Sequence, residues 1–427
     1  MTLPGILLAA REAFWSRPLE LDIVRESDTY SGEMQILSRL DGRDGVRKAQ
    51  GVTVMPQTAT AAKRERTKQS FLEESAFMRF SSPLFSALSR ACADDDDMVE
   101  LGSRARPGQP VGMLVPMAAQ YLLFKSPDPK LARYFASMTD TPEPAAQAFP
   151  DFREFCLDRR EELTPVLESR TVNATLVERS STILPALAYV SRLVREPLTL
   201  VEICCSVGVN LLFDEYHYDY GPAGRVGADQ SCIRLDCRTI GSSRPPVDFI
   251  PEVVRRVGVD LMGIDLSDPS EHLWMQATIC PEWRQEREHL KTALSLRATR
   301  PMRIIVGDAL EVLPSLLEEL SGPLCVLHTH CMGQWTQEAK DRLDNILRAG
   351  ARERDIHRVG IDRLYQEAPE TVRARLAKLA AARIPLTQKS MPSSIEHTWY
   401  TKSEVNTRLL GQADGCGGWI DWGGGSA

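Results

Sequence analysis

The stretch that decides the fold is Leu198-Thr-Leu-Val-Glu-Ile-Cys-Cys-Ser-Val-Gly-Val-Asn-Leu-Leu-Phe-Asp-Glu-Tyr216. Its first part, residues 198–203, is a short and nearly continuous apolar run, which is typical of a strand covered on both faces of a parallel sheet. From Gly208 onward the apolar residues recur every three or four positions, as on one side of an amphipathic helix. The stretch therefore predicts a buried strand, a tight turn and a helix.

Turns of this kind present backbone N–H groups and a helix N-terminus to a ligand at the carboxyl edge of an α/β sheet. The usual pattern is an acid followed by three glycines at alternate positions. Here Glu202 takes the place of the acid and Gly208 that of the third glycine, while Cys204 and Ser206 stand where the first two glycines would be. A side chain at Cys204 intrudes where the backbone must approach a ligand closely.

After this stretch, strands and helices alternate, which is the signature of an α/β domain. Residues 302–306 and 324–328 are short buried strands, and residues 309–320 between them are helical. The chain ends in strands without intervening helices, with a hairpin turn at residues 414–417. The order predicts a Rossmann-like, methyltransferase-type sheet with a C-terminal antiparallel hairpin.

The first half of the chain shows no alternation of strand and helix patterns. Residues 1–67 mix short apolar clusters with polar and Gly-rich pieces, which predicts an extension that is partly disordered. Residues 68–196 carry helical patterns that stop at prolines, asparagines and aspartates; Ser82-Pro83 is typical of a helix start, and Asn173 is the expected cap of the last helix. We therefore expect a helical N-terminal domain at residues 68–196 and the α/β domain at residues 197–427.

Composition narrows the class of partner. The chain has 427 residues and a formal net charge of −7, so we expect a small-molecule substrate rather than nucleic acid or an anionic membrane. No window approaches the roughly 18 uncharged apolar residues that span a bilayer. The ten cysteines form no C-x-x-C pair, which favours reduced thiols and a cytoplasmic location.

Several ordered motifs together resemble a bacterial family catalogued as a domain of unknown function, over residues 71–422. The motifs are Ser206-x-Gly208-x-Asn210-Leu211, the Tyr-rich run ending at Gly221, Gly258-Val-Asp260-Leu, Asp265 to Pro269 with Trp274, Pro281-Glu282, Gly307-Asp-Ala309 with Leu313-Pro314, and His328. The resemblance implies a helical N-terminal part followed by a Rossmann-like, methyltransferase-like domain. Members of that family typically have glycine where this chain has Cys204.

A methyltransferase-like sheet suggests S-adenosylmethionine as cofactor. Glu202, Gly208 and Asn210, together with Cys204 and Ser206 of the turn, are the candidates for its methionine part. A carboxylate at the end of the second strand would bind the ribose, and Asp265 is the candidate, with Asp236 as its rival. Asp308, which follows the strand at residues 302–306, suits the adenine.

His328 is the candidate general base, since it follows a buried strand and imidazole titrates near neutral pH. The leading hypothesis is methyl transfer to a small molecule. A non-catalytic, Rossmann-like ligand-binding or assembly protein is the first alternative. A metal-assisted hydrolase that uses His328 and His330 is the second. Two buried apolar thiols are the favoured interpretation of Cys204 and Cys205, and a nucleophile pair with a depressed thiol pKa near a helix N-terminus is the alternative.

Overall fold

The computed structural model describes residues 57–79, 81–364, 369–384 and 392–423. Contacts join residues 56–427 into one compact unit. The division between residues 196 and 197 therefore stays a prediction. Most of the predicted extension lies outside the described residues, and its last part, from Gln57, belongs to a long helix.

The first part of the unit is helical, as the sequence predicts. Ser82 accepts a hydrogen bond from Phe85 N at 3.1 Å and Pro83 is the first residue of the helix, which confirms the predicted helix start. Phe85 meets Phe135 edge to face in the core of these helices. The helices are α2 (Gln57–Met78), α3 (Pro83–Cys92), α4 (Asp96–Gly102), α5 (Val111–Lys125), α6 (Pro129–Ala132), α7 (Phe149–Asp158) and α8 (Arg160–Ser169).

The predicted helix start at Asn173 is wrong. Residues 171–176 are not helical, a 3-10 turn follows at η2 (Val177–Arg179), and α9 (Ser180–Val194) begins only at Ser180. Thr175 donates to the Ser206 hydroxyl at 3.2 Å, a tertiary contact that the extended backbone permits. The segment before α9 thus reaches the turn that follows the first strand.

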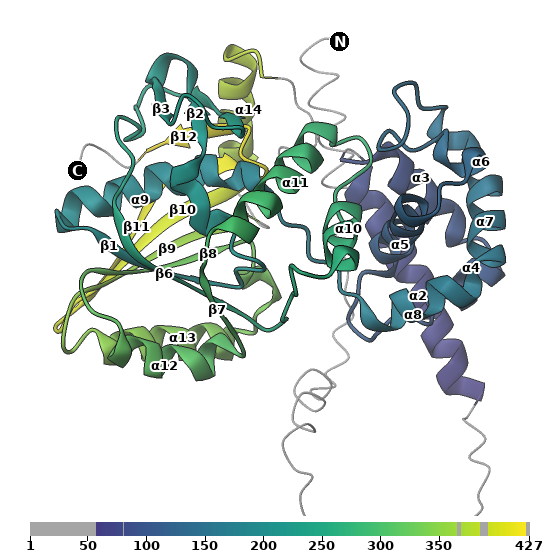
Figure 1. The fold of residues 1–427 in the computed structure, drawn as a ribbon, viewed down its shortest axis with the longest axis horizontal. Coiled ribbons are helices and arrows are strands. Elements are labelled where there is room, and N and C mark those ends of the chain that lie inside the picture. The colour runs from purple at the N-terminus through teal and green to yellow at the C-terminus, as the bar shows by residue number, and fades with distance from the viewer. Residues whose placement is uncertain (1–56, 80, 365–368, 385–391, 424–427) are drawn as a thin grey trace, which may run out of the picture. The chain divides into compact units, whose positions relative to one another are not determined.

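The second part contains a nine-stranded sheet in the order β5-β12-β11-β10-β9-β8-β1-β6-β7 (Figure 1). The five strands from β9 to β7 are mutually parallel, which confirms the α/β class. The strands are β1 (Leu198–Ile203), β5 (Arg238–Ile240), β6 (Val253–Asp260), β7 (Arg303–Val306), β8 (Leu324–Thr329), β9 (Ile356–Arg363), β10 (Pro392–Tyr400), β11 (Val405–Asp414) and β12 (Trp419–Trp422).

Helices pack on both faces of this sheet. Leu198 and Leu200 of β1 share a core with α9 and α11 (Arg284–Thr299), whereas Val201 and Ile203 share one with α12 (Ala309–Glu319) and α13 (Gln337–Gly350). Figure 1 shows α12 and α13 together on one side of the strands. The chain moves from β1 outward through β6 and β7, then returns to β8 on the other side of β1. The order of the strands therefore reverses beside β1, the place where ligands bind in open α/β sheets.

The connection from β1 to β6 is not the predicted helix. A short 3-10 segment, η3 (Asn210–Glu215), leads into a separate three-stranded sheet of β2 (His217–Asp219), β3 (Arg225–Gly227) and β4 (Arg234–Asp236). The buried hydroxyls of Tyr216 and Tyr218 donate to the carbonyls of Val209 and Phe213. Val209 O also accepts a 3-10 hydrogen bond from Leu212 N at 3.2 Å, so side-chain donors add to the backbone bonds of this short segment.

The C-terminal strands form the predicted antiparallel hairpin. β10 runs antiparallel to β9 and to β11, and β12 pairs antiparallel with β11, after a turn at residues 414–417. The two remaining helices are α10 (Pro269–Ala277) and α14 (Pro369–Ala381). Gln120 of α5 donates to the carbonyls of Ala277 and Ile279, both at 2.9 Å, so α10 joins the helical part to the sheet.

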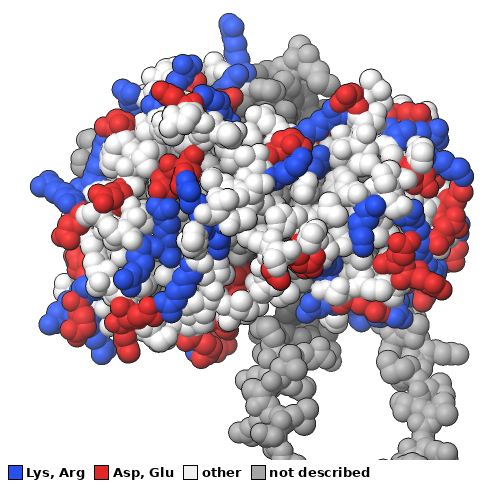
Figure 2. All heavy atoms as spheres, viewed as in Figure 1, with Lys and Arg blue, Asp and Glu red and all other residues white. Residues whose placement is uncertain are grey.

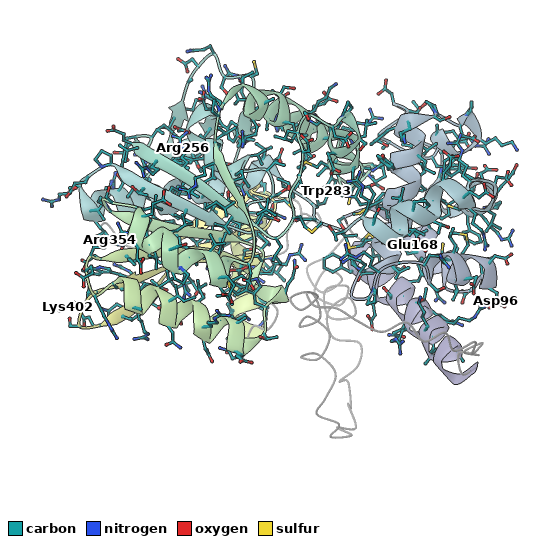
Figure 3. All side chains as sticks on the ribbon, turned by 60° about the horizontal axis from the view of Figure 1, so that its bottom comes forward. Asp96, Glu168, Arg256, Trp283, Arg354 and Lys402 are labelled. Carbon is teal, nitrogen blue, oxygen red and sulfur yellow. The ribbon has the colours of Figure 1, made fainter. Side chains whose placement is uncertain are left out.

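Charged side chains of both signs are interspersed on the face shown in Figure 2. Some of them bind backbone carbonyls at helix ends. Arg354, labelled in Figure 3, donates to the Leu317 carbonyl at 2.7 Å near the C-terminus of α12. A cation at this end of a helix also interacts favourably with the helix dipole. Among the described helices, none is both long enough and apolar enough to span a bilayer.

Candidate functional site at the carboxyl edge of the sheet

The turn after β1 is strained at three alternate positions. Cys204 (φ 57°), Ser206 (φ 53°) and Gly208 (φ 78°) all have left-handed backbone conformations. For the two non-glycine residues this conformation costs about 1 kcal/mol each. A Cβ on Gly208 would lie 2.9 Å from Met302 Sδ, so glycine is also required for close packing. Strain of this kind is characteristic of functional sites.

Glu202 and Asn210 form a buried pair beneath this turn. Asn210 Nδ2 donates to Glu202 Oε1 at 2.8 Å, while Glu202 Oε2 and Asn210 Oδ1 have no hydrogen-bond partner among the described residues. Burial raises the pKa of Glu202 to about 8, and the nearby Asp260 charge adds to this effect. The pair therefore offers two unused oxygens at the point where the strand order reverses.

The acid that ends the strand next to β1 is Asp260, so the expectation of Asp265 or Asp236 at this place is wrong. Asp260 Oδ2 accepts from Ser206 N at 2.7 Å and Oδ1 accepts from Met262 N at 2.9 Å. Asp236 belongs to the separate three-stranded sheet, and Asp265 lies in an exposed turn where it binds Ser267. An apolar run that ends in an acid, at residues 257–260, was the signal that could have identified Asp260.

Asp308 lies directly after β7, as predicted. Its Oδ1 accepts a hydrogen bond from Leu310 N at 2.9 Å and so caps α12. β7 is the neighbour of β6, which ends at Asp260. Asp308 thus lies on the same edge as Glu202 and Asp260, while its role as an adenine ligand stays a prediction.

His328 occupies the end of β8 beside an acid that the sequence did not reveal. His328 Nδ1 lies 2.9 Å from Asp362 Oδ2, in a geometry that does not align a hydrogen bond. The other Asp362 oxygen accepts from Met332 N at 3.1 Å. A Cβ on Gly360 would lie 2.6 Å from His328 Cε1, so the absence of a side chain on β9 makes room for the imidazole. Asp362 comes from the neighbouring strand, and only the pairing of β8 with β9 places it there.

His330 follows β8 in a left-handed conformation (φ 55°). Burial lowers its pKa well below the ordinary value, with help from the charges of Arg179 and Arg363. Its Nδ1 has no hydrogen-bond partner among the described residues. No group of three or more His, Cys, Asp and Glu side chains with metal-binding geometry occurs in the described part of the chain, so His328 and His330 gain no third ligand there.

The thiols of this edge do not form an activated nucleophile pair. Burial raises the pKa of Cys205, the reverse of the depressed value that the nucleophile reading requires. Cys331, after β8, lies beside Cys204, and a hydrogen bond between the two thiols together with burial raises the pKa of Cys331. The fold thus places Cys204 next to Cys331, a cysteine that is far away in the sequence.

Two surface cavities lie away from this edge. One is lined mainly by charged residues of α6 and α7 and the other by Leu266, Ser267, Pro269, His272 and Leu273, close to the turn at Asp265. Neither is lined by residues 204–210, Asp308 or His328. The case for the edge therefore depends on its unpartnered polar atoms and strained backbone.

The fold and the edge define an α/β protein with a polar cluster at the reversal point of a doubly wound sheet. The chain belongs to a family described as an uncharacterized protein conserved in bacteria (DUF2332), whose model matches residues 68–422. Among curated proteins, none matches the chain.

Proposed function

We propose that this protein binds S-adenosylmethionine at the carboxyl edge of its sheet and transfers the methyl group to a small molecule. The observation that carries the proposal is the pair of unpartnered oxygens, Glu202 Oε2 and Asn210 Oδ1, buried where the strand order reverses. An unpartnered buried acceptor costs on the order of 1–3 kcal/mol, so a ligand donor at this place is expected. The reversed edge formed by β10 also supports a methyltransferase-type sheet.

The donor set of the edge fits this cofactor. The two free oxygens of Glu202 and Asn210 suit the ammonium group of its methionine part, and Asp260 and Asp308 offer further lone pairs for hydroxyl and amino groups. Bound S-adenosylmethionine supplies an electrophilic methyl group. The short η3 segment offers no long helix dipole for the cofactor carboxylate. The N–H groups of Cys205, Ser206 and Gly208 already have acceptors, so the carboxylate would have to bind other N–H groups of the turn.

His328 would act as the general base for the acceptor. Asp362 lies 2.9 Å from its Nδ1, which favours an imidazolium after proton transfer. Gly360 of β9 has no side chain, which leaves the imidazole ring room beside that strand. Binding energy and alignment would supply most of the rate enhancement, since an in-line displacement depends on the orientation of the two reactants.

Calorimetric titration of the purified protein with S-adenosylmethionine tests the proposal. Because an ammonium group stabilises ionised Glu202, whose pKa in the free protein is about 8, binding near pH 7 should release a proton. The heat should then vary with the ionisation enthalpy of the buffer. Affinity should rise with pH up to about 8. In Glu202→Gln the buffer dependence should vanish and the affinity should fall about tenfold.

Glu168→Gln, which removes a surface partner of Arg104 in the helical part, is the matched control and should bind like the wild type. Figure 3 shows Glu168 in that part of the molecule, among the helices. If neither the wild type nor Cys204→Gly binds the cofactor, the methyltransferase proposal is wrong.

A non-catalytic ligand-binding protein is the second candidate, and Cys204 favours it. Its side chain occupies the first glycine place of the turn in a left-handed conformation. If the wild type fails to bind S-adenosylmethionine and Cys204→Gly binds it, the protein has kept the Rossmann-like fold but has lost cofactor binding through the Cys204 side chain. Transfer of the methyl group from bound S-adenosylmethionine to a small molecule by the wild type would remove this candidate.

A further inference from the structure

Two arginines and a histidine meet at the far end of the same edge. Arg363 is the last residue of β9, and His330 follows β8, with its N–H bound to the Ile361 carbonyl at 2.8 Å. Ser393, the register partner of Arg363 on β10, places its hydroxyl 3.5 Å from His330 Nε2. We call Arg179, Arg363 and His330 the cationic cluster.

Arg179 reaches the cluster from the turn before α9. Its Nε lies 3.4 Å from the Gly415 carbonyl, and Gly415 follows Asp414, which pairs with Pro392 at the start of β10. A Cβ on Gly417 would lie 2.0 Å from the Glu178 carbonyl, so the hairpin turn packs directly on this segment. Burial lowers the pKa of Arg179, yet part of the residue remains accessible. A guanidinium in this position lies deep but within reach of a ligand.

The acids around the cluster are already engaged or are reluctant to ionise. Glu178 lies 2.8 Å from His289 of α11, and Asp362 lies beside His328. Burial raises the pKa of Glu202 to about 8 and that of Glu74 on α2 to about 7. Glu202 and Glu74 therefore contribute little negative charge at neutral pH, and Glu178 and Asp362 lie against histidines rather than in hydrogen bonds with the two arginines.

The hydrogen bonds and ring contacts of the two arginines leave both guanidinium groups able to bind an anion. Arg179 makes long hydrogen bonds, both 3.4 Å, to the carbonyls of Gly415 and Ala174. The Arg363 guanidinium lies over the Phe77 ring of α2, with its carbon 5.3 Å from the ring centre. Among the described residues, neither forms an ion pair at hydrogen-bonding distance. A guanidinium without a carboxylate partner in a partly buried place is the usual arrangement for binding a carboxylate or phosphate.

We propose that the cationic cluster binds an anionic group, carboxylate or phosphate, of the small molecule that His328 would deprotonate. His330 would donate from its neutral imidazole, and its unpartnered Nδ1 is the group that such a ligand satisfies. His328 and His330 are two residues apart, so an acceptor held at the cluster would extend toward the proposed base. This inference rests on the proposed function for the identity of the ligand as an acceptor, but anion binding itself does not require the cofactor.

Anion binding can be measured without the cofactor. Inorganic phosphate and succinate, titrated separately into the full chain, serve as the two probes, with tryptophan fluorescence and calorimetry as readouts. Saturable binding of one probe is expected. Arg179→Gln and Arg363→Gln should each weaken it by about tenfold, because each removes one charge-assisted hydrogen-bonding partner. Arg363→Lys should retain more affinity than Arg363→Gln, since it keeps the charge and loses only the forked geometry.

Arg104→Gln is the control, because Arg104 pairs with Glu168 on the surface of the helical part. Arg363 is a partly exposed residue at a strand end, so its variant should fold like the wild type by circular dichroism even if Arg179→Gln does not. The inference is overturned if neither probe binds, or if the Arg363 variant binds as tightly as the control. Cofactor binding without anion binding would overturn this inference alone, and anion binding without cofactor binding would overturn the methyl-transfer proposal alone.

Discussion

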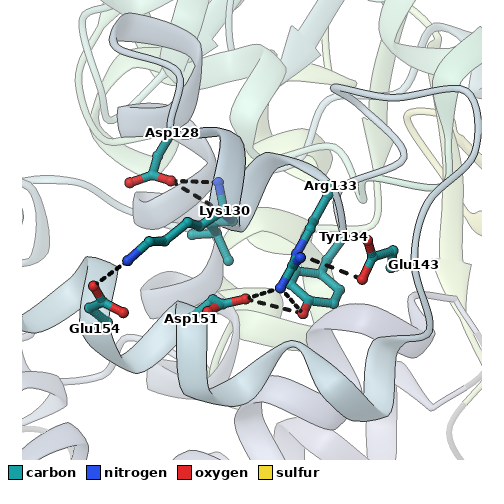
Figure 4. A network of polar contacts seen from close by, with 8 residues as sticks. Asp128, Lys130, Arg133, Tyr134, Glu143, Asp151 and Glu154 are labelled. Atoms are coloured by element: carbon teal, nitrogen blue, oxygen red, sulfur yellow. Dashed lines mark hydrogen bonds and ion pairs between the residues drawn. The ribbon is translucent and has the colours of Figure 1, made fainter.

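Two polar clusters of this protein differ in how completely their atoms are paired. On the helical part, Arg133 lies 2.7 Å from Asp151, Tyr134 donates to the same carboxylate at 3.1 Å, and Lys130 lies 2.7 Å from Glu154 (Figure 4). Hydrogen bonding to Arg133 lowers the pKa of Asp151, as expected for a partnered acid. Part of this surface network lines a cavity, which gives it the appearance of a site, but each of its charged groups already has a hydrogen-bond or ion-pair partner.

The edge of the sheet shows the opposite arrangement. Glu202, Asn210, His328 and His330 each have a buried nitrogen or oxygen without a hydrogen-bond partner among the described residues. Such atoms cost stability, whereas exposed ion pairs contribute little in either direction. The two clusters thus differ in how completely their polar atoms are paired. Because single unpartnered atoms also occur elsewhere among the described residues, the edge is the better candidate for a ligand site where incomplete pairing coincides with the reversal of the strand order.

Glu202→Gln should give the largest change in stability between the two clusters. The pKa of Glu202 rises from 4.5 to about 8 on folding, so the wild type loses stability as pH rises from about 4.5 to about 8. In the variant, the side-chain carbonyl of the introduced glutamine can still accept the hydrogen bond from Asn210. The glutamine does not ionise, so the variant should not lose stability in this pH range. Urea unfolding at pH 5 and pH 8.5 should show a steeper fall for the wild type, by on the order of 3 kcal/mol. If the free energy of unfolding depended on pH equally in the two proteins, the pKa of Glu202 would not be raised by folding.

Gly360→Ala should give the next effect. The new methyl group would meet His328 Cε1 at 2.6 Å, so the imidazole or the strand must shift. Overpacking of this kind costs about 1–3 kcal/mol. Gly423→Ala, whose methyl group would lie 3.8 Å from the Leu410 carbonyl, is the matched control and should be close to neutral. A Gly360→Ala protein with unchanged urea midpoint would show that His328 is not confined against β9.

Lys130→Gln should give the smallest effect, because its ion pair with Glu154 is exposed at the surface. The urea midpoint should differ less from that of the wild type than in either preceding variant. The small difference should shrink further at high salt, which screens exposed charges. A loss comparable to that of Gly360→Ala would contradict the contrast drawn between the two clusters.

Much of the fold could be predicted from local patterns. The apolar runs at residues 198–203, 302–306 and 324–328 are strands, and the last strands of the chain form the expected hairpin. Helix extents were less predictable. The segment expected to be a helix after Gly208 is a 3-10 segment whose Val209 and Phe213 carbonyls accept hydrogen bonds from the Tyr216 and Tyr218 hydroxyls, and the helix period alone does not reveal such side-chain contacts.

The candidate site could be predicted only in part. Glu202, Asn210 and His328 were identifiable because they interrupt or follow apolar strands, and Asp308 because it follows one. The sequence favours Asp265 or Asp236 and does not single out Asp260, because β6 ends in a segment without clear periodicity. Asp362 and Arg363, like His328, lie at the end of an apolar strand. Their neighbours in space are known only once β9 is paired with β8 and β10.

By itself the sequence determined the α/β class and the tight turn after the first strand, because these depend on residues that are close together in the chain. Ordered motifs between residues 206 and 328 also revealed the similarity to an uncharacterized bacterial family. Only the tertiary structure decided which polar groups meet. Arg179, Glu202, His330 and Arg363 come from separate elements that the sheet register brings to one edge. Whether a buried polar group is satisfied depends on partners far away in sequence, and that is the property that marks this edge as a site.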